Sequence, residues 1–142
     1  MTTDLMVATN CQCKKLREAS RKISRIYDDA LRPVGITANQ FTMLIGISLM
    51  GPISITGLAN KLGMERTTLT RNLTPLEKKG LIELNTGHGR TRNATITPQG
   101  KDVIKKAKPE WKTAQTQIIK QIGKQNLQAL NNTLSLISTL DD

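Results

Sequence analysis

Residues 58 to 82, LANKLGMERTTLTRNLTPLEKKGLI, constrain the fold of this chain more than any other segment. Ala59 and Leu62 are spaced to pack inward on a short helix, and Gly63 supplies the permissive backbone of a tight turn. The next helix carries leucines at i, i+4 and i+7, namely Leu69, Leu73 and Leu76. The segment therefore predicts two helices joined by a tight turn, which is a helix-turn-helix.

The polar side of the second helix suits the major groove of DNA. At about 100° per residue, the side chains that point away from the leucines or flank them include Arg66, Thr67, Thr68, Thr70, Arg71 and Thr74. Arginine can pair with guanine edges, and threonine can touch a thymine methyl group or a phosphate. We expect this face to contact DNA, with Arg66 on a phosphate. The alternative is a solvated helix face.

The charge balance favours a polyanionic partner. The chain has 21 Lys and Arg against 11 Asp and Glu, a net charge of +10. A membrane-surface helix would combine this charge with bulky aromatic residues, and single-strand binding would need exposed rings, but the chain has one Trp, one Tyr and one Phe. Double-stranded DNA is the favoured partner. The alternative is a non-specific architectural nucleic-acid-binding protein or one that binds an anionic membrane surface.

Helices are predicted on both sides of this motif. Apolar residues at steps of three and four predict a helix over 11–32 that Pro33 ends, and Thr37 caps a second helix that runs to Met50. Ser54 or Thr56 opens the short helix of the motif. Two further helices are expected, at 98–122 and 125–140, the last with a leucine-rich stripe.

A β-hairpin is predicted after Gly80, which ends the recognition helix. Apolar residues around 81–84 and 94–96 favour two strands, and Arg90 and Arg92 lie on the loop side of the hairpin. An arginine at such a tip can enter a narrow A·T-rich minor groove. We expect both arginines to contact DNA, the alternative being a solvated turn.

These elements predict a mainly α fold with a small β-hairpin wing, in a single domain over 1–142. Residues 34–97 form the winged helix-turn-helix core, and the helices at 11–33 and 98–142 serve dimerisation. The outer helices cannot all bury their apolar faces on a core of about 60 residues, so a second copy of the chain is expected to cover them. A two-fold dimer would also present two recognition helices about one DNA turn apart.

The chain resembles the MarR family, the winged-helix regulators of the multiple-antibiotic-resistance type, over nearly its whole length. The segments that carry the resemblance are GITANQF at 35–41, the helix-turn-helix at 58–82 and GRTRNATITPQG at 89–100. The resemblance implies a homodimer on a palindromic operator, usually a repressor, that a small phenolic or lipophilic ligand or an oxidant releases. Where this family often has an acidic residue that buttresses an arginine, the chain has His88.

Two groups of residues are candidates for sensing. Cys11 and Cys13 precede a helix whose first turns are basic, and positive charge favours a reactive thiolate. One hypothesis is therefore a redox switch. The other is that the two cysteines are simply small packing residues. Tyr27, Phe41 and Trp111 are the chain's aromatic residues, and they either line a pocket for a small aromatic effector or simply belong to the core.

Several classes of site are not expected. Two cysteines and one histidine do not make a four-ligand zinc site, so no metal or other cofactor is predicted. No acid-base pair or nucleophile triad is visible, so the protein is not expected to be an enzyme. The N-terminal segment lacks the pattern of a secretory signal, which favours the cytoplasm, in association with the nucleoid through DNA.

Overall fold

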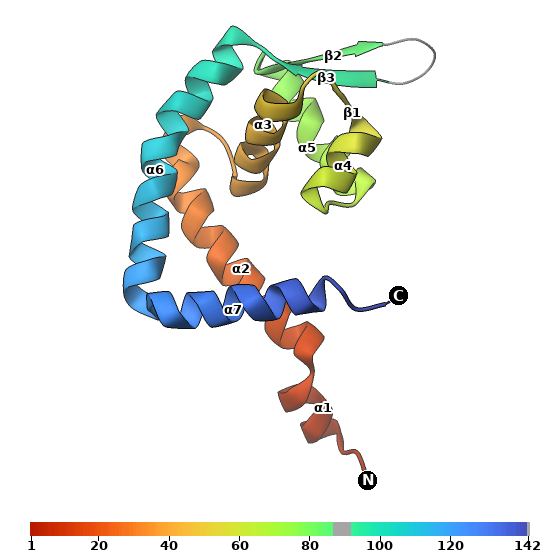
Figure 1. Cartoon of the computed structure of the whole chain (residues 1–142), viewed down its shortest axis with the longest axis vertical. Helices are drawn as coiled ribbons and strands as arrows, with labels where there is room; N and C mark the ends of the chain where they lie inside the picture. The colour runs from red at the N-terminus through yellow and green to blue at the C-terminus, as the bar shows by residue number, and fades with distance from the viewer. Residues whose placement is uncertain (87–91, 142) are drawn as a thin grey trace.

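Helices dominate the chain, and a small sheet lies at one end of them (Figure 1). The computed structural model describes residues 1–86 and 92–141. In chain order the elements are α1 (Asp4–Asn10), α2 (Gln12–Leu31), the 3₁₀ turn η1 (Arg32–Val34), α3 (Ala38–Met50), β1 (Ile53–Ser54), α4 (Ile55–Leu62), α5 (Arg66–Lys78), β2 (Ile82–Thr86), β3 (Arg92–Ile96), α6 (Pro98–Ile122) and α7 (Lys124–Ile137). The mainly α fold with a β wing is confirmed.

The start of α3 is fixed by the predicted cap. The Thr37 hydroxyl accepts a hydrogen bond from the Gln40 amide at 3.2 Å, and the Gln40 side-chain oxygen accepts one from the Thr37 amide at 3.0 Å. The Asp28 carboxylate accepts a third bond, from the Ala38 amide at 2.7 Å. The last turns of α2 are thereby bonded to the first turn of α3.

Two glycines end the helices of the helix-turn-helix. At Gly63, with φ of +63°, the chain leaves α4, and the Met64 amide donates to the Ala59 carbonyl at 3.0 Å. At Gly80, with φ of +74°, it leaves α5, and the Leu81 amide donates to the Leu76 carbonyl at 3.0 Å. Both turns need a residue in the left-handed region, where glycine meets no side-chain penalty.

The core lies where α3, α4, α5 and the sheet meet. Leu69, Leu73 and Leu76 of α5 are at most 1% exposed, as the leucine spacing predicts, and they pack in one cluster with α3 residues such as Leu44 and Ile47. Among the described residues no single helix is long and apolar enough to cross a membrane. The segments Gln12–Val34 and Ala38–Met50 pass that test only together, with a 71° bend between them.

The wing belongs to a three-stranded antiparallel sheet of order β1-β3-β2. The hairpin strands are confirmed, and the two-residue strand β1 is an addition that the sequence analysis does not predict. β3 pairs on one side with β2, with Leu84 opposite Ala94, and on the other with β1, with Ile53 opposite Ala94. Ala94 therefore lies at the centre of the sheet and is fully buried.

The outer helices leave much apolar surface exposed. α2 packs along α6, and α7 leaves the end of α6 in a new direction (Figure 1). α7 contains no buried residue, although its leucine stripe is present as predicted. α1, which the sequence analysis does not predict, adds three more large exposed apolar side chains. The large exposed apolar residues of α1 and α7 are Leu5, Met6, Val7, Leu130, Leu134, Leu136 and Ile137.

Candidate nucleic-acid interface

The polar side of α5 is exposed because its opposite side is buried in the core. Five of the six predicted residues are exposed, while Thr68 is half-buried at the flank. We call the exposed five the recognition face, namely Arg66, Thr67, Thr70, Arg71 and Thr74. Four of them, all but Thr74, line one shallow hollow on the surface of α5. The face therefore combines two guanidinium groups with three threonines on one side of a helix.

Two threonine hydroxyls of the recognition face donate to the helix backbone. Thr70 donates to the Arg66 carbonyl at 2.9 Å, and Thr74 donates to the Thr70 carbonyl at 3.3 Å. With their hydrogens used in this way, both side chains present an oxygen acceptor and a methyl group to a ligand. Base amino groups and thymine methyl groups are the DNA features that match this pair.

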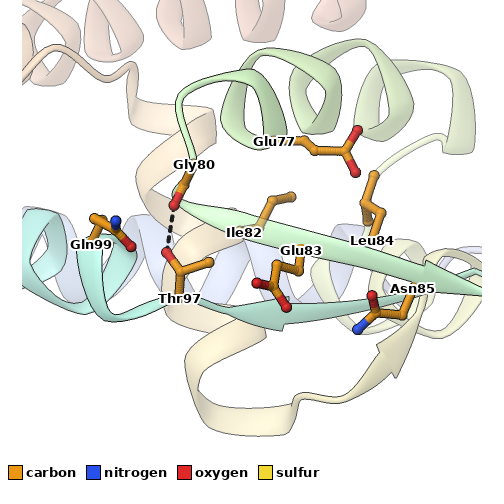
Figure 2. Close-up of a pocket in the computed structure, with 8 residues that line it drawn as sticks. All are labelled: Glu77, Gly80, Ile82, Glu83, Leu84, Asn85, Thr97 and Gln99. Atoms are coloured by element: carbon orange, nitrogen blue, oxygen red, sulfur yellow. Dashed lines mark hydrogen bonds between the residues drawn. The ribbon is translucent and has the colours of Figure 1, made fainter.

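The base of the wing is bonded to the end of α5. The Thr97 hydroxyl donates to the Gly80 carbonyl at 2.6 Å, the bond drawn in Figure 2. The same oxygen accepts from the Gly100 amide at 3.0 Å, which caps α6. One side chain thus joins the recognition helix, the wing and the long helix α6.

Farther along the wing, Arg92 forms an ion pair with α5. Its guanidinium nitrogen lies 3.7 Å from a carboxylate oxygen of Glu77, and the two side chains are 51% and 40% exposed. The sequence analysis names Arg92 as a DNA contact but not Glu77, because the two residues lie on different elements and no spacing rule connects them. Arg90 and His88 lie outside the described residues.

The three aromatic residues come together from three helices. Tyr27 of α2 and Trp111 of α6 stack, with ring centroids 6.4 Å apart and planes inclined by 21°. Phe41 of α3 and Trp111 line a hollow, almost wholly apolar, with Ile45 and with the lysines Lys108 and Lys112. We call this hollow the aromatic pocket. The sequence analysis names its aromatic residues but misses the two lysines, which lie three positions before Trp111 and directly after it.

Tyr27 is partly buried between α2 and α6. Its hydroxyl donates a hydrogen bond to the side-chain oxygen of Gln115. Burial raises the pKa of the Tyr27 phenol above its ordinary value of 10.0, because the charged phenolate loses hydration.

The two cysteines lie where α1 meets α2. Cys11 is the residue between the helices and is half-buried, and Cys13 is exposed on the first turn of α2. Both are free thiols. An Arg17 guanidinium nitrogen donates to the Cys13 sulfur at 3.1 Å, so a positive charge does lie next to this thiol. Within residues 1–86 and 92–141 no three His, Cys, Asp or Glu side chains gather as a metal site.

A family model and several known proteins match this chain. The MarR family model matches residues 36–85, from the start of the core to β2. An uncharacterised helix-turn-helix transcriptional regulator of Bacillus cereus is 27% identical over 96 residues, a match covering 68% of this chain and 65% of that protein. The chain thus spans just under two thirds of the length of such curated relatives.

Two solved structures share the fold. The Mycobacterium tuberculosis transcriptional regulator MosR in complex with DNA is 33% identical, with a TM-score of 0.79, over 91% of this chain and 96% of that one. A mutant of the Escherichia coli regulator MarR, complexed with operator DNA, has a TM-score of 0.82 at 22% identity, over 95% and 99% of the two chains. Fold and sequence therefore agree on one family.

The raised pKa of Tyr27 predicts a late titration. Because the chain has one tyrosine, the ultraviolet absorbance of phenolate reports this residue alone, and its midpoint should lie above 10.0 in the folded protein. In urea the midpoint should return to about 10. The pKa of Tyr27 is higher in the folded than in the unfolded protein. Its contribution to stability is therefore fully present below the pKa of the unfolded protein, and it is lost as the pH rises through the pKa of the folded protein. Equal midpoints in both states would contradict the burial of the phenol.

Proposed function

The chain belongs to the MarR family of winged-helix transcriptional regulators, and from this membership we propose that it binds a palindromic DNA operator as a homodimer and represses transcription. The observation that carries the proposal is the recognition face. Its leucine side is buried in the core, which leaves Arg66, Arg71 and three threonines as the exposed side of α5. MosR and MarR, which have the same fold, are solved with DNA.

The proposed roles divide between base contacts and backbone contacts. Arg71 and the threonines of the recognition face read base edges in the major groove, and Arg66, near the first turn, holds a phosphate. Arg90 and Arg92 of the wing approach the neighbouring minor groove. The net charge of +10 adds a sequence-independent attraction to the phosphates.

The homodimer is inferred from surface that one chain cannot bury. Leu130 and Leu134 on α7 are 44% and 41% exposed, and Leu5 and Val7 on α1 are more than half exposed. Exposed apolar surface of this extent is typical of an interaction site. A second copy supplies the same surface, and a two-fold axis then relates two recognition helices to the two halves of a palindrome.

Release by a small ligand is proposed at the aromatic pocket. Phe41, Ile45 and Trp111 line it together with Lys108 and Lys112. This combination fits a flat aromatic ring that carries a negative charge, such as an aromatic acid. The pocket joins α3 of the core to α6, so a ligand there would bias the angle between the core and the long helices.

Oxidation is the second proposed trigger. The Cys13 sulfur is exposed and accepts a hydrogen bond from the Arg17 guanidinium at 3.1 Å, so oxidants can reach it. The pair Cys11 and Cys13 lies at the junction of α1 and α2, next to the apolar surface assigned to the dimer. A change of covalent state there would alter how the two copies pack. A bond within Cys-X-Cys would be strained, so a disulfide between subunits is the expected product.

Replacement of Arg71 by alanine tests base reading. The operator is first obtained as the genomic fragment that the protein binds most tightly. The variant should lose about 1–3 kcal/mol of binding free energy on this fragment and little on a random duplex, because a base contact acts only on the correct sequence. Fluorescence anisotropy measures both. Arg25→Ala is the control: it removes the same charge from an exposed residue of α2, outside the core, and should not change the preference for the selected fragment. Equal losses on both duplexes would exclude base reading by Arg71.

Replacement of Leu134 by aspartate tests the dimer. A charge in the apolar stripe of α7 should shift the protein from dimer to monomer at micromolar concentration, because the carboxylate would have to be buried without a partner. Gln128→Glu adds the same charge to an exposed residue of the same helix, about 120° around it from Leu134, and should leave the dimer intact. Sedimentation equilibrium reports the mass. A monomeric wild type would contradict the proposal.

Salicylate and peroxide test the two routes of release. Salicylate should quench the fluorescence of Trp111, the chain's one tryptophan, and should weaken operator binding over the same concentration range. Peroxide should weaken operator binding of the wild type and produce a disulfide-linked dimer on a non-reducing gel. The variant Cys11→Ser/Cys13→Ser should respond to salicylate only.

Each route has its own contradicting result. A flat fluorescence titration would exclude the aromatic acid from the pocket. Unchanged operator affinity and gel mobility after peroxide treatment would exclude the redox switch, whatever the salicylate result.

A further inference from the structure

We propose that Glu77 is a positioning residue for DNA-sequence preference: through its ion pair with Arg92 it holds the wing at a fixed angle to the recognition helix. The inference rests on the proposed DNA-binding function and assigns the selectivity of that surface in part to a carboxylate. A carboxylate close to DNA is otherwise unfavourable, because it repels phosphates.

The register of the wing shows why Arg92 points toward α5. Cross-strand pairing places Ile82 opposite Ile96, Leu84 opposite Ala94 and Thr86 opposite Arg92. Since alternate residues of a strand share a face, Arg92, Ala94 and Ile96 lie on one side of β3. Ala94 is fully buried on that side. Arg92 is therefore the charged continuation of the apolar row that packs the wing onto the core.

Glu77 lies on the helix side of β2. In Figure 2 its side chain extends from α5 beside Leu84, whereas Glu83 and Asn85 project from the other side of the strand. The carboxylate of Glu77 thus meets the guanidinium of Arg92 at 3.7 Å, at the edge of the apolar contact.

Besides the pairing of β3 with β1 and the buried apolar row, two polar attachments separated along the hairpin hold it in place. The inner one is the bond from Thr97 to the Gly80 carbonyl at 2.6 Å, at the base of the wing. The outer one is the pair of Glu77 and Arg92, which lies toward the tip. The pairing with β1 reaches Asn93 and the buried row reaches Ala94, so without the outer pair the start of β3 at Arg92 is free to move relative to α5. The outer pair restricts this motion, and so the wing and the recognition face keep one relative placement.

The pair is half-exposed, which sets the size of the effect. Exposed ion pairs change an equilibrium constant by up to about fivefold, and salt weakens them. Glu77 also competes with DNA phosphates for Arg92. On random DNA, an Arg92 released from Glu77 gains contacts with phosphates. On the operator, the displaced wing loses the contacts that it makes with the specific sequence. Loss of the ion pair is therefore expected to lower the ratio of the two affinities, that is, the affinity for the operator divided by the affinity for random DNA.

The test compares Glu77→Gln with Glu83→Gln, which removes the same charge from the opposite, exposed side of the wing. Affinities are measured for the genomic fragment selected as operator and for a random duplex of equal length. Glu83→Gln should strengthen both by the same factor, so the ratio stays constant. Glu77→Gln should lower the ratio by about twofold to fivefold, and high salt should reduce this difference.

Variants of Arg92 separate positioning from direct contact. Arg92→Lys keeps the ion pair and should keep the ratio of the two affinities. Arg92→Gln should lower that ratio at least as far as Glu77→Gln does, because the proposed minor-groove contact is lost together with the pair. Adding Glu77→Gln to Arg92→Gln should lower it no further, since Glu77 acts through Arg92. Circular dichroism of each variant checks that the fold is retained.

Two results would overturn the inference. One is an equal ratio for Glu77→Gln and Glu83→Gln. The other is a further fall of the ratio when Glu77→Gln is added to Arg92→Gln, which would mean that Glu77 acts independently of Arg92. A wild type without preference for its selected fragment would instead contradict the proposed function itself, so the two failures are distinguishable.

Discussion

The packing of three leucines under α5 fixes the orientation on which the rest of the surface depends. Leu69, Leu73 and Leu76 are at most 1% exposed, and turning α5 about its axis would expose them. Burying a leucine side chain is worth about 1.5–3 kcal/mol, so the core outweighs any single polar contact on the outer side. The position of the recognition face, and through Gly80 the start of the wing, follows from this burial.

Local signals predicted most of the fold. The leucine spacing gives α5, Thr37 gives the start of α3, and Gly63 and Gly80 give the two turns, because each acts through neighbours within one or two helical turns. The recognition face follows from the same periodicity. The sequence also predicted the exposed leucines of α7, because the core is too small to bury the apolar faces of all the outer helices.

The features that the sequence did not reveal depend on tertiary contacts. The strand β1 has two residues and exists because Ile53 pairs with Ala94, a partner far along the chain. The stacking of Tyr27 on Trp111 joins two helices that no periodicity relates. In the sequence, Glu77 is one more charged residue on an exposed helix. Its ion pair depends on the register of the hairpin, which places Arg92 on the side of β3 that faces α5. Sequence reasoning thus identified the exposed residues of the recognition face but not the tertiary contacts around them.

The central claim is that this surface distinguishes one DNA sequence from others, and a competition experiment on the wild type tests it most directly. The palindrome recovered from genomic fragments competes with a random duplex of the same length at one stated salt concentration. The account predicts that the palindrome is bound about 10³-fold more tightly or better, as sequence-specific regulators do. Equal competition by the two duplexes would leave only electrostatic attraction by the net charge of +10 and would contradict the account.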